Sequence, residues 1–376
     1  MAVGTHCCHA AGHRNPICCI VPPHLFDRIA RNGSDEQREW ALDTLGRDHS
    51  LRTARVQNVL AGLAPALRAD ALAASTPGQA KRTIYDVKGT ETLPGEVVRA
   101  EGGPKGGDAA ANEAYDGLGD TYTFYWEVFH RDSLDDAGLP LDAVEHYGQN
   151  YDNAFWDGHR MIFGDGDGKL FNRFTIAVDV IGHELTHGVT QHTLALNYWQ
   201  EPGALNESIS DVFGSLVKQY AKKQSTADAD WLIGEGLLAP GVHGRALRDM
   251  KNPGTAYDDP VLGKDPQPAT MADFDHTVSD NGGVHTNSGI PNRAFYLVAD
   301  KLGGNAWEKP GSIWYATIRD PQVRPTARFA EFARATQRAA RRIFGNTSDE
   351  AKAVTEAWQE VGVEVPAVPP GEPAQS

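Results

Sequence analysis

The sequence predicts an α+β protein with a mixed, β-rich first half, a mainly helical second half and a cleft between them. Strand-like runs fall in the first half, at 83–87 and 160–163. Between them, apolar residues recur every three to four positions over 112–130, which is the helical period. After a helix candidate at 175–192 the chain turns strongly helical. Strands followed by a run of helices are typical of α+β proteins.

The chain divides where its composition changes. Residues 1–75 end in a stretch rich in Ala, Pro, Ser and Gly, which is typical of an accessible linker. The tail at 365–376 is rich in proline and is expected to be disordered. Between them we expect a β-rich lobe over 82–190, which ends in the helix at 175–192, and a helical lobe over 191–364.

The charge and the cysteine content argue against several kinds of partner and metal module. Lys and Arg number 35 against 50 Asp and Glu, a net charge of −15, which argues against nucleic-acid and acidic-membrane partners because both need a positive field. The start of the chain lacks the apolar core of a signal peptide, so we expect the protein to stay inside or to leave by another route. All four cysteines precede residue 20 and match no zinc module.

The strongest chemical signal is the segment HELTH at 183–187. On a helix, His183 and His187 lie one turn apart on the same face, so both imidazoles can reach one Zn²⁺. Glu184 lies beside the first histidine and can act as a general base without binding the metal. The neighbouring residues are apolar, as expected for a buried helix. The segment therefore predicts a zinc site.

A catalytic zinc needs a third protein ligand and an open position. His192 does not fit the HExxHxxGxxH pattern, because it lies nine residues after His183 and a threonine stands where glycine is required. Glu207 fits better, at the start of a second predicted helix after a loop that contains Gly203. Asp211 follows one turn later, so one carboxylate can bind metal while the other orients a ligand histidine. The alternative is an acidic first turn that only complements the helix dipole.

The chain resembles the thermolysin-type zinc metallopeptidases over about 85–362. Besides HELTH and NESISD, the matching blocks are NAFW at 153–156, GDGDG at 164–168, Arg248 and DNGGVHTNSG at 280–289. PPHL at 22–25 resembles the short propeptide of the protealysin-like branch. The resemblance implies a two-lobed fold with the HExxH helix at the cleft. It also implies a zinc-dependent neutral endopeptidase made as a zymogen.

The resemblance implies a role for each matched residue. His183, His187 and Glu207 would bind one zinc ion, with Asp211 orienting His183 and with Glu184 as general base. The oxyanion would be stabilised by His285 and Tyr198, with Asp280 orienting His285. The peptide backbone would be held by Asn153, Ala154 and Arg248.

The matched specificity pocket is apolar, which favours a hydrophobic side chain on the leaving-group side of the cut bond. The alternative is that these residues are ordinary core. They are Phe171, Phe174, Val180, Ile233, Leu237 and Leu247.

The calcium positions depart from the family pattern. Asp179, Asp230 and Glu235 match ligands of a double-calcium site, but other residues stand where further oxygen ligands are expected. An ammonium group there can replace the charge of one cation, so we expect one structural calcium. The departing residues are Lys218, Leu232 and Gly236.

These observations favour an endopeptidase that cuts on the amino side of hydrophobic residues, with residues 1–75 as a propeptide that acts in cis. The alternatives are another zinc hydrolase, such as an aminopeptidase, and a non-enzymatic metal-binding interaction protein. Intact Glu184, Tyr198 and His285 speak against the second, because a structural metal site needs none of them. We expect a monomer acting on proteins or peptides, without nucleic-acid or membrane partners. The resemblance suggests secretion by a non-classical route, with a cytoplasmic location as the alternative.

Overall fold

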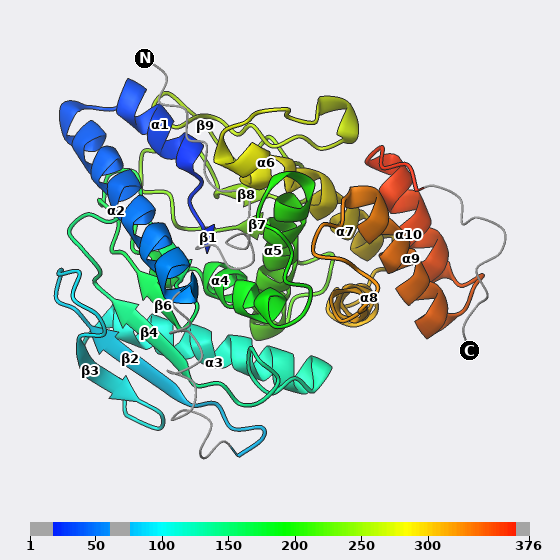
Figure 1. Cartoon of the computed structure of the whole chain (residues 1–376), viewed down its shortest axis with the longest axis horizontal. Helices are drawn as coiled ribbons and strands as arrows, with labels where there is room; N and C mark the ends of the chain where they lie inside the picture. Colours follow the sequence, from blue (N-terminus) through cyan, green and yellow to red (C-terminus); the bar gives the residue numbers. More distant parts are fainter. Residues whose placement is uncertain (1–17, 61–75, 366–376) are drawn as a thin grey trace.

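The computed structural model describes residues 18–60 and 76–365. Within them a β-sheet lobe and a helical lobe lie side by side, with two further helices from the N-terminal unit across them (Figure 1). The predicted α+β fold is confirmed. The cysteines before residue 18, most of the expected linker and nearly all of the expected tail lie outside the described residues.

The first lobe is built on a mixed six-stranded sheet in the order β1-β5-β6-β4-β2-β3. Strands β2, β4 and β6 pair in parallel, whereas β1–β5, β5–β6 and β2–β3 pair antiparallel. The edge strand β1 comes from the N-terminal unit, so that unit extends the sheet of the lobe. The strands are β1 (Cys18–Cys19), β2 (Arg82–Asp86), β3 (Glu96–Ala100), β4 (Leu141–Glu145), β5 (Ala154–Trp156) and β6 (Arg160–Phe163).

Helix α3 (Ala109–Phe129) connects the sheet to the interior of the molecule. Its N-cap is Asp108, whose carboxylate accepts a hydrogen bond from the backbone N–H of Ala110 at 2.8 Å. It ends at His130, which adopts a left-handed conformation with φ 54°. The helix contacts β2 and β4 of the sheet and also helix α4.

Helices α4 (Val178–Gln191) and α5 (Gln200–Lys222) cross at the centre of the molecule. Every residue of α4 from Asp179 to Thr190 is buried. The crossing is close because it is lined by glycine. A Cβ added to Gly214 would lie only 2.4 Å from the carbonyl oxygen of Asp179, and one added to Gly182 would lie 3.1 Å from Gly214 Cα. This close contact brings the polar faces of the two helices together.

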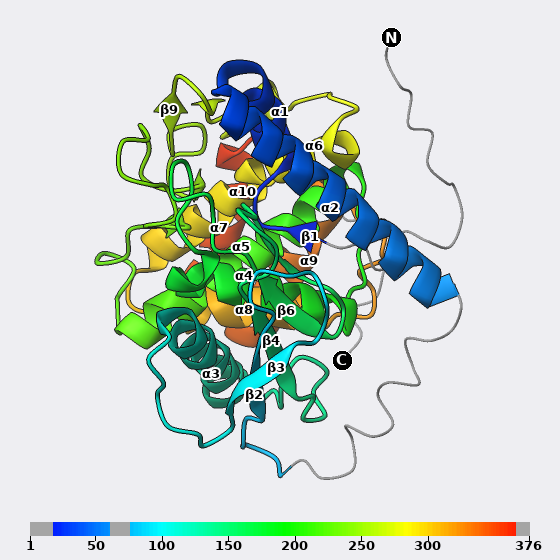
Figure 2. The same cartoon turned by 90° about the vertical axis from the view of Figure 1, so that its left-hand side faces the viewer.

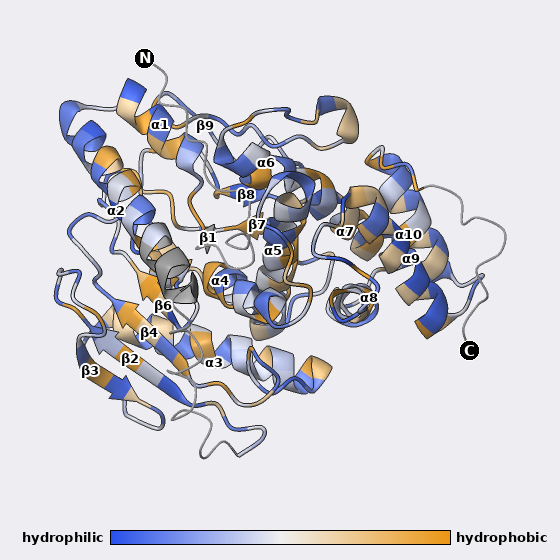
Figure 3. Ribbon diagram, viewed as in Figure 1, coloured by the Kyte–Doolittle hydropathy of each residue, from blue (hydrophilic) through white to orange (hydrophobic). Residues whose placement is uncertain are grey.

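The second lobe packs amphipathic helices around a tryptophan-rich core. Trp314 of α8 and Trp358 of α10 stack with ring centroids 6.4 Å apart, and both are fully buried. Hydrophilic and hydrophobic segments alternate along α9, as expected for a helix with one buried face (Figure 3). The helices are α6 (Asp280–Asn287), α7 (Gly289–Leu302), α8 (Lys309–Ile318), α9 (Phe329–Phe344) and α10 (Asp349–Glu360). The short elements are β7 (Leu232–Ile233), β8 (Arg248–Asp249), β9 (Asp258–Asp259), β10 (Gly263–Lys264) and 3₁₀ turns at Phe174–Ile176 and Met271–Asp273.

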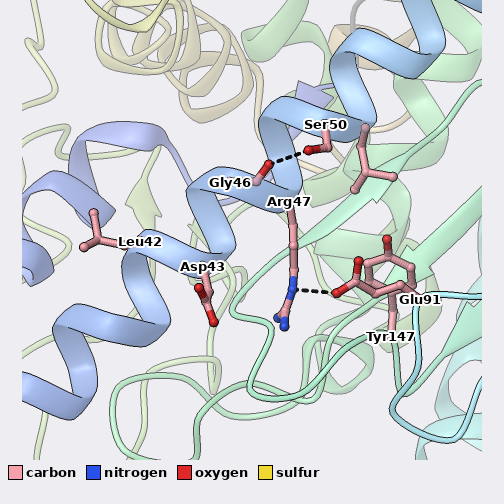
Figure 4. A pocket seen from close by; sticks show the side chains of 8 residues that line it. Leu42, Asp43, Gly46, Arg47, Ser50, Glu91 and Tyr147 are labelled. Atoms are coloured by element: carbon pink, nitrogen blue, oxygen red, sulfur yellow. Dashed lines mark hydrogen bonds and ion pairs between the residues drawn. The ribbon is translucent and has the colours of Figure 1, made fainter.

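The N-terminal unit lies over the outside of both lobes as two helices, α1 (Pro23–Asn32) and α2 (Asp35–Leu60) (Figure 2). Apolar residues of α1 are buried in the main core, namely Leu25, Phe26 and Ile29. Arg47 of α2 forms an ion pair of 2.9 Å with Glu91 of the sheet lobe. These two residues line a pocket at the seam between α2 and the lobe, and no residue of the HELTH segment is among its lining residues (Figure 4). In the described part of the chain, no helix is long and apolar enough to cross a membrane.

Candidate active site

The two histidines of HELTH converge with Glu207 at the α4–α5 crossing. The Nε2 atoms of His183 and His187 lie 3.0 Å apart, and each lies 3.5 Å from a carboxylate oxygen of Glu207. All three side chains are buried, and their ligand atoms lie within 4.8 Å of one another. Two imidazoles and a carboxylate in this geometry fit one zinc ion and leave a fourth position open.

Glu207 lies inside α5 and not in its first turn. The helix begins at Gln200, whereas the sequence predicted its start at Glu207 after a loop containing Gly203. Gly203 lies within the helix. Glycine is needed at this position because a Cβ there would lie 2.4 Å from the side chain of Val284. The alternative, an acidic first turn that complements the helix dipole, is therefore wrong for Glu207.

Each ligand histidine is oriented through its second ring nitrogen. His183 Nδ1 lies 2.8 Å from Asp211, and His187 Nδ1 lies 3.0 Å from the side-chain oxygen of Asn206. Both contacts favour the tautomer that leaves Nε2 available to a metal ion. Sequence reasoning identified Asp211 but missed Asn206, although it precedes Glu207 directly in the chain.

Asp211 is also the centre of a buried polar network. Arg248 donates two hydrogen bonds of 2.8 Å to its carboxylate, and Asn292 donates a third of 2.8 Å. Burial acts to raise the pKa of Asp211, but the charge of Arg248 and the hydrogen bond to His183 outweigh it and lower the pKa to about 2. The carboxylate therefore stays ionised while it orients His183 and Arg248.

Glu184 is buried next to the zinc ligands. Its Oε2 atom accepts a hydrogen bond of 3.0 Å from the backbone N–H of Trp156, whereas Oε1 has no hydrogen-bond partner. Burial raises the pKa of Glu184 well above its usual range, and the charge of His183 acts in the opposite direction. A zinc ion held by the adjacent ligands would likewise favour the carboxylate form. The site residues therefore fit zinc.

His285, Tyr198 and Asp280 meet beside Glu207. The Tyr198 hydroxyl donates to Glu207 and lies 3.3 Å from His285 Nε2. Asp280 accepts from His285 twice, from Nδ1 at 2.7 Å and from the backbone N–H at 2.9 Å. Burial acts to lower the pKa of His285, but Asp280 and Glu207 reverse this effect and raise it. The ring is thus held as a hydrogen-bond donor facing the zinc ligands.

The three predicted backbone-binding residues all contact the N-terminal unit. The side-chain oxygen of Asn153 accepts from Val21 N–H at 3.0 Å, and the carbonyl of Ala154 accepts from Ile20 N–H at 3.1 Å. Arg248 donates to the carbonyl oxygen of Ile20 at 3.0 Å. Sequence reasoning expected a segment near Pro22 and Pro23 to lie by the cleft, but it did not identify residues 19–21 as the bound strand.

The six residues of the predicted specificity pocket are buried in the main core. Ile233 pairs with Arg248 across β7 and β8, which brings it beside the arginine that holds Ile20. Leu237 and Leu247 approach each other at Gly234. The positions suit a pocket wall and ordinary packing alike, so their role in specificity stays a prediction.

At the predicted calcium cluster, Lys218 is the central group. Its ammonium lies 2.9 Å from Asp179 and 2.8 Å from Asp230, and it donates to the carbonyl of Leu232 at 2.7 Å. Glu235 lies at the solvent-facing side, 3.9 Å from Lys222. Lys218 thus supplies a positive charge at the centre of this cluster; how many calcium ions bind there stays a prediction.

Comparison with known proteins decides the family. Residues 74–191 match the thermolysin metallopeptidase catalytic domain, and residues 195–363 match its alpha-helical domain. This chain belongs to the thermolysin family of metallopeptidases. Residues 18–52 match the protealysin propeptide. The chain is therefore a metalloendopeptidase made as a precursor, and its zinc site is the HExxH-plus-glutamate site typical of the thermolysin family.

Relatives along nearly the whole length support this assignment. An extracellular metalloprotease of Pectobacterium carotovorum is 53% identical over 93% of this chain and 97% of its own length. Protease PrtS of a Photorhabdus species is 49% identical over 92% of each chain. The solved precursor of protealysin from Serratia proteamaculans is 53% identical, with a TM-score of 0.84, and the match covers 92% of this chain and all of that one.

Proposed function

We propose that this thermolysin-family enzyme cleaves peptide bonds on the amino side of hydrophobic residues. We also propose that its propeptide blocks the cleft by binding there as a substrate would. The observation that carries both is the strand Cys18–Cys19 with Ile20 and Val21. It adds to the edge of the sheet at β5, and its backbone is held by Asn153, Ala154 and Arg248.

The hydrogen bonds support a substrate-like register. The carbonyl oxygen of Cys19 accepts from His285 Nε2 at 3.1 Å, where a developing oxyanion would be stabilised. The backbone N–H of the next residue, Ile20, donates to the carbonyl oxygen of Ala154, and the carbonyl oxygen of Ile20 accepts from Arg248. The peptide bond between Cys19 and Ile20 therefore takes the position of the bond to be cut. Ile20 is fully buried on the leaving-group side, which supports the preference for a hydrophobic residue there.

In the reaction, Glu184 would accept a proton from the attacking water and pass it to the leaving amine. Zinc held by His183, His187 and Glu207 would supply Lewis acidity that activates this water and polarises the carbonyl. His285 and Tyr198 would donate hydrogen bonds to the oxyanion, and Asp280 would keep His285 oriented and protonated. Arg248 would hold the carbonyl on the leaving side.

The propeptide is anchored well beyond the strand. Asp48 of α2 accepts from Asn153 at 2.9 Å and from the hydroxyl of Tyr151 at 2.5 Å. Asn153 is therefore engaged by α2 and by the strand at the same time. Because strand and helices belong to the same chain, the strand competes at a high effective concentration until the chain is cut. We propose that cutting falls in the linker around 64–85 and is at least partly autocatalytic.

We propose two further properties. The first is one structural calcium at Asp179, Asp230 and Glu235. The proximity of these carboxylates supports it: burial, and then the neighbouring Asp230, raise the pKa of Glu235, and a cation bound between the two groups would relieve their repulsion. The second is action outside the cell on protein substrates, which is supported by relatives named as extracellular metalloproteases. That the enzyme acts as a monomer stays a prediction.

Peptide libraries test the central proposal. Mature enzyme lacking residues 1–75 should cut mainly before Ile, Leu, Val and Phe, and o-phenanthroline should abolish the activity. Intact precursor should be nearly inactive on the same peptides. Cleavage before acidic residues at a comparable rate, or a fully active intact precursor, would contradict the specificity and the inhibition respectively.

A further inference from the structure

A second group of potential metal ligands lies outside the catalytic site, at the carboxyl end of β4. Among the described residues, only two groups of three His, Cys, Asp or Glu side chains lie close enough to share an ion, and this is the other one. It consists of Asp108, Glu145 and His146, whose ligand atoms all lie within 4.8 Å of one another. His146 Nε2 is 2.8 Å from Asp108 Oδ2 and 4.0 Å from Glu145 Oε1.

Glu145 is the observation that points to a ligand. Its side chain is 1% exposed, and neither carboxylate oxygen has a hydrogen-bond partner. Burying a carboxylate without donors is costly unless a proton or a cation compensates it. Burial, and then the charge of Asp108, raise the pKa of Glu145 to about 8.

His146 is oriented as a metal ligand would be. Its Nδ1 atom lies 2.8 and 2.9 Å from the two carboxylate oxygens of Asp165, which is part of the GDGDG segment. A carboxylate on Nδ1 fixes the ring and directs Nε2 toward a metal, the usual arrangement around ligand histidines. His146 also adopts a left-handed backbone conformation with φ 56°, which is uncommon outside glycine and often found at functional sites.

We infer that Asp108, Glu145 and His146 form a second metal site for a zinc-type divalent ion. One imidazole and two carboxylates suit zinc, whereas calcium prefers oxygen ligands throughout. Asp108 and His146 are both partly exposed, so an ion can enter and water can complete its coordination. The site differs from the catalytic centre in its elements and in its ligand set.

Such an ion would join two segments of the sheet lobe directly and a third through Asp165, which holds His146. Asp108 caps the start of α3, Glu145 ends β4, and Asp165 follows β6. Because binding requires these segments to be folded together, the ion would stabilise the lobe by an amount that grows with its concentration. The competing arrangement is an ion-pair network in which His146 is protonated between Asp108 and Asp165, and Glu145 holds a proton.

Zinc titration of the full chain separates these two arrangements. The Glu184→Gln variant, which should not digest itself, is prepared with one zinc per chain and then titrated with zinc or calcium. We expect a second equivalent of zinc, a rise in the midpoint of thermal unfolding with zinc, and no displacement of zinc by calcium.

Further substitutions are added to this background. Glu145→Gln and His146→Gln should lose the second equivalent and keep the first, which also reports correct folding. Asp165→Asn keeps all three ligands and should weaken the second site about 10- to 100-fold. His243→Gln changes an exposed histidine elsewhere and should titrate like its parent.

Three results would overturn the inference. One is a parent that binds a single zinc. Another is a second equivalent that survives both Glu145→Gln and His146→Gln, which would assign it to other residues, such as the histidines and cysteines before residue 18. The third is a second site whose affinity is unchanged in Asp165→Asn.

Discussion

His285 Nε2 lies 3.1 Å from the carbonyl oxygen of Cys19. The other ring nitrogen lies 2.7 Å from the carboxylate of Asp280, so the ring faces an acceptor on each side; burial acts to lower the pKa of His285, but Asp280 and Glu207 outweigh it and raise the pKa. The group that would stabilise the oxyanion of a substrate is thus already engaged by the propeptide. Under the proposed mechanism, inhibition and catalysis would therefore use the same hydrogen-bond donor.

Glu184→Gln should leave zinc binding and the fold intact and remove nearly all peptidase activity. The amide keeps the shape of the side chain but cannot accept the proton of the attacking water. Zinc content and peptide hydrolysis are measured on the same sample. As the contrast, His183→Ala should lose zinc together with activity. A Glu184→Gln enzyme that hydrolyses peptides at a near wild-type rate would refute the assignment.

Ile20→Ala should weaken propeptide inhibition before any cleavage. Ile20 is fully buried in the precursor, and shortening a buried isoleucine to alanine costs about 2–5 kcal/mol. The cost falls on the bound state only, because the released propeptide exposes this side chain. We therefore expect a clear rise in the initial activity of intact precursor. Asp27→Ala, an exposed change in α1, is the control, and equal activity of the two variants would contradict the substrate-like binding of Ile20.

Asp211→Asn should weaken zinc binding about 10- to 100-fold, because the amide orients His183 less well than the carboxylate does. It also removes the charge that holds Arg248, so mature enzyme reloaded with excess zinc should still show a raised KM. Zinc loss to a chelator is followed alongside peptide kinetics. Asp320→Asn, a carboxylate paired with Arg338 in the helical lobe, should change neither quantity.

Calcium should raise the stability of the protein through a single site at Asp179, Asp230 and Glu235. Only one site is expected because Lys218 already supplies a positive charge between Asp179 and Asp230. Calorimetric titration should give one tight calcium per chain, and chelation should lower the midpoint of thermal unfolding. Glu235→Gln should reduce that shift, whereas Glu308→Gln, elsewhere on the surface, should not. Two tight sites, or none, at this cluster would refute the prediction.

The zinc site could be predicted from the sequence because its spacing is local. His183 and His187 are fixed by the helical repeat, and the spacing of Glu207 and Asp211 on the next predicted helix indicated the third ligand before the resemblance gave it the same role. The start of α5 could not be predicted, because Gly203 lies in the helix for a tertiary reason: only glycine leaves room for Val284 of α6. Local propensity treats the same glycine as part of a loop.

Two other features depend on contacts between distant segments. Nothing in the sequence around Cys19 and Ile20 marks them as a strand, because β1 is two residues long and exists only through pairing with Phe155 and Trp156. Asp108 and His146 are likewise separated along the chain and meet only because α3 begins beside the end of β4. Such sites have no sequence period to reveal them.

The last prediction is that acid weakens the inhibition by the propeptide through His24. This histidine of α1 lies 3.5 Å from the hydroxyl of Tyr257, and its Nδ1 atom has no hydrogen-bond partner. Burial lowers its pKa to about 4; Asp280 opposes this effect, while the positive charges of His285, Arg28 and Arg248 add to it. A released propeptide would expose His24, with a pKa near its ordinary value of about 6.5.

The direction of this pH effect follows from the lowered pKa of His24 in the bound propeptide. Above about pH 6.5 His24 is neutral whether the propeptide is bound or released, so the propeptide keeps its full affinity for the cleft. As the pH falls from about 6.5 toward 4, the released form takes up a proton that the bound form resists, and the affinity drops by up to about tenfold per pH unit. The activity of intact precursor, divided by that of mature enzyme at the same pH, should therefore rise on acidification. His24→Asn should flatten this ratio, and His49→Asn, which changes an exposed histidine of α2, should not. Equal pH dependence in the His24→Asn and His49→Asn precursors would show that other groups control release.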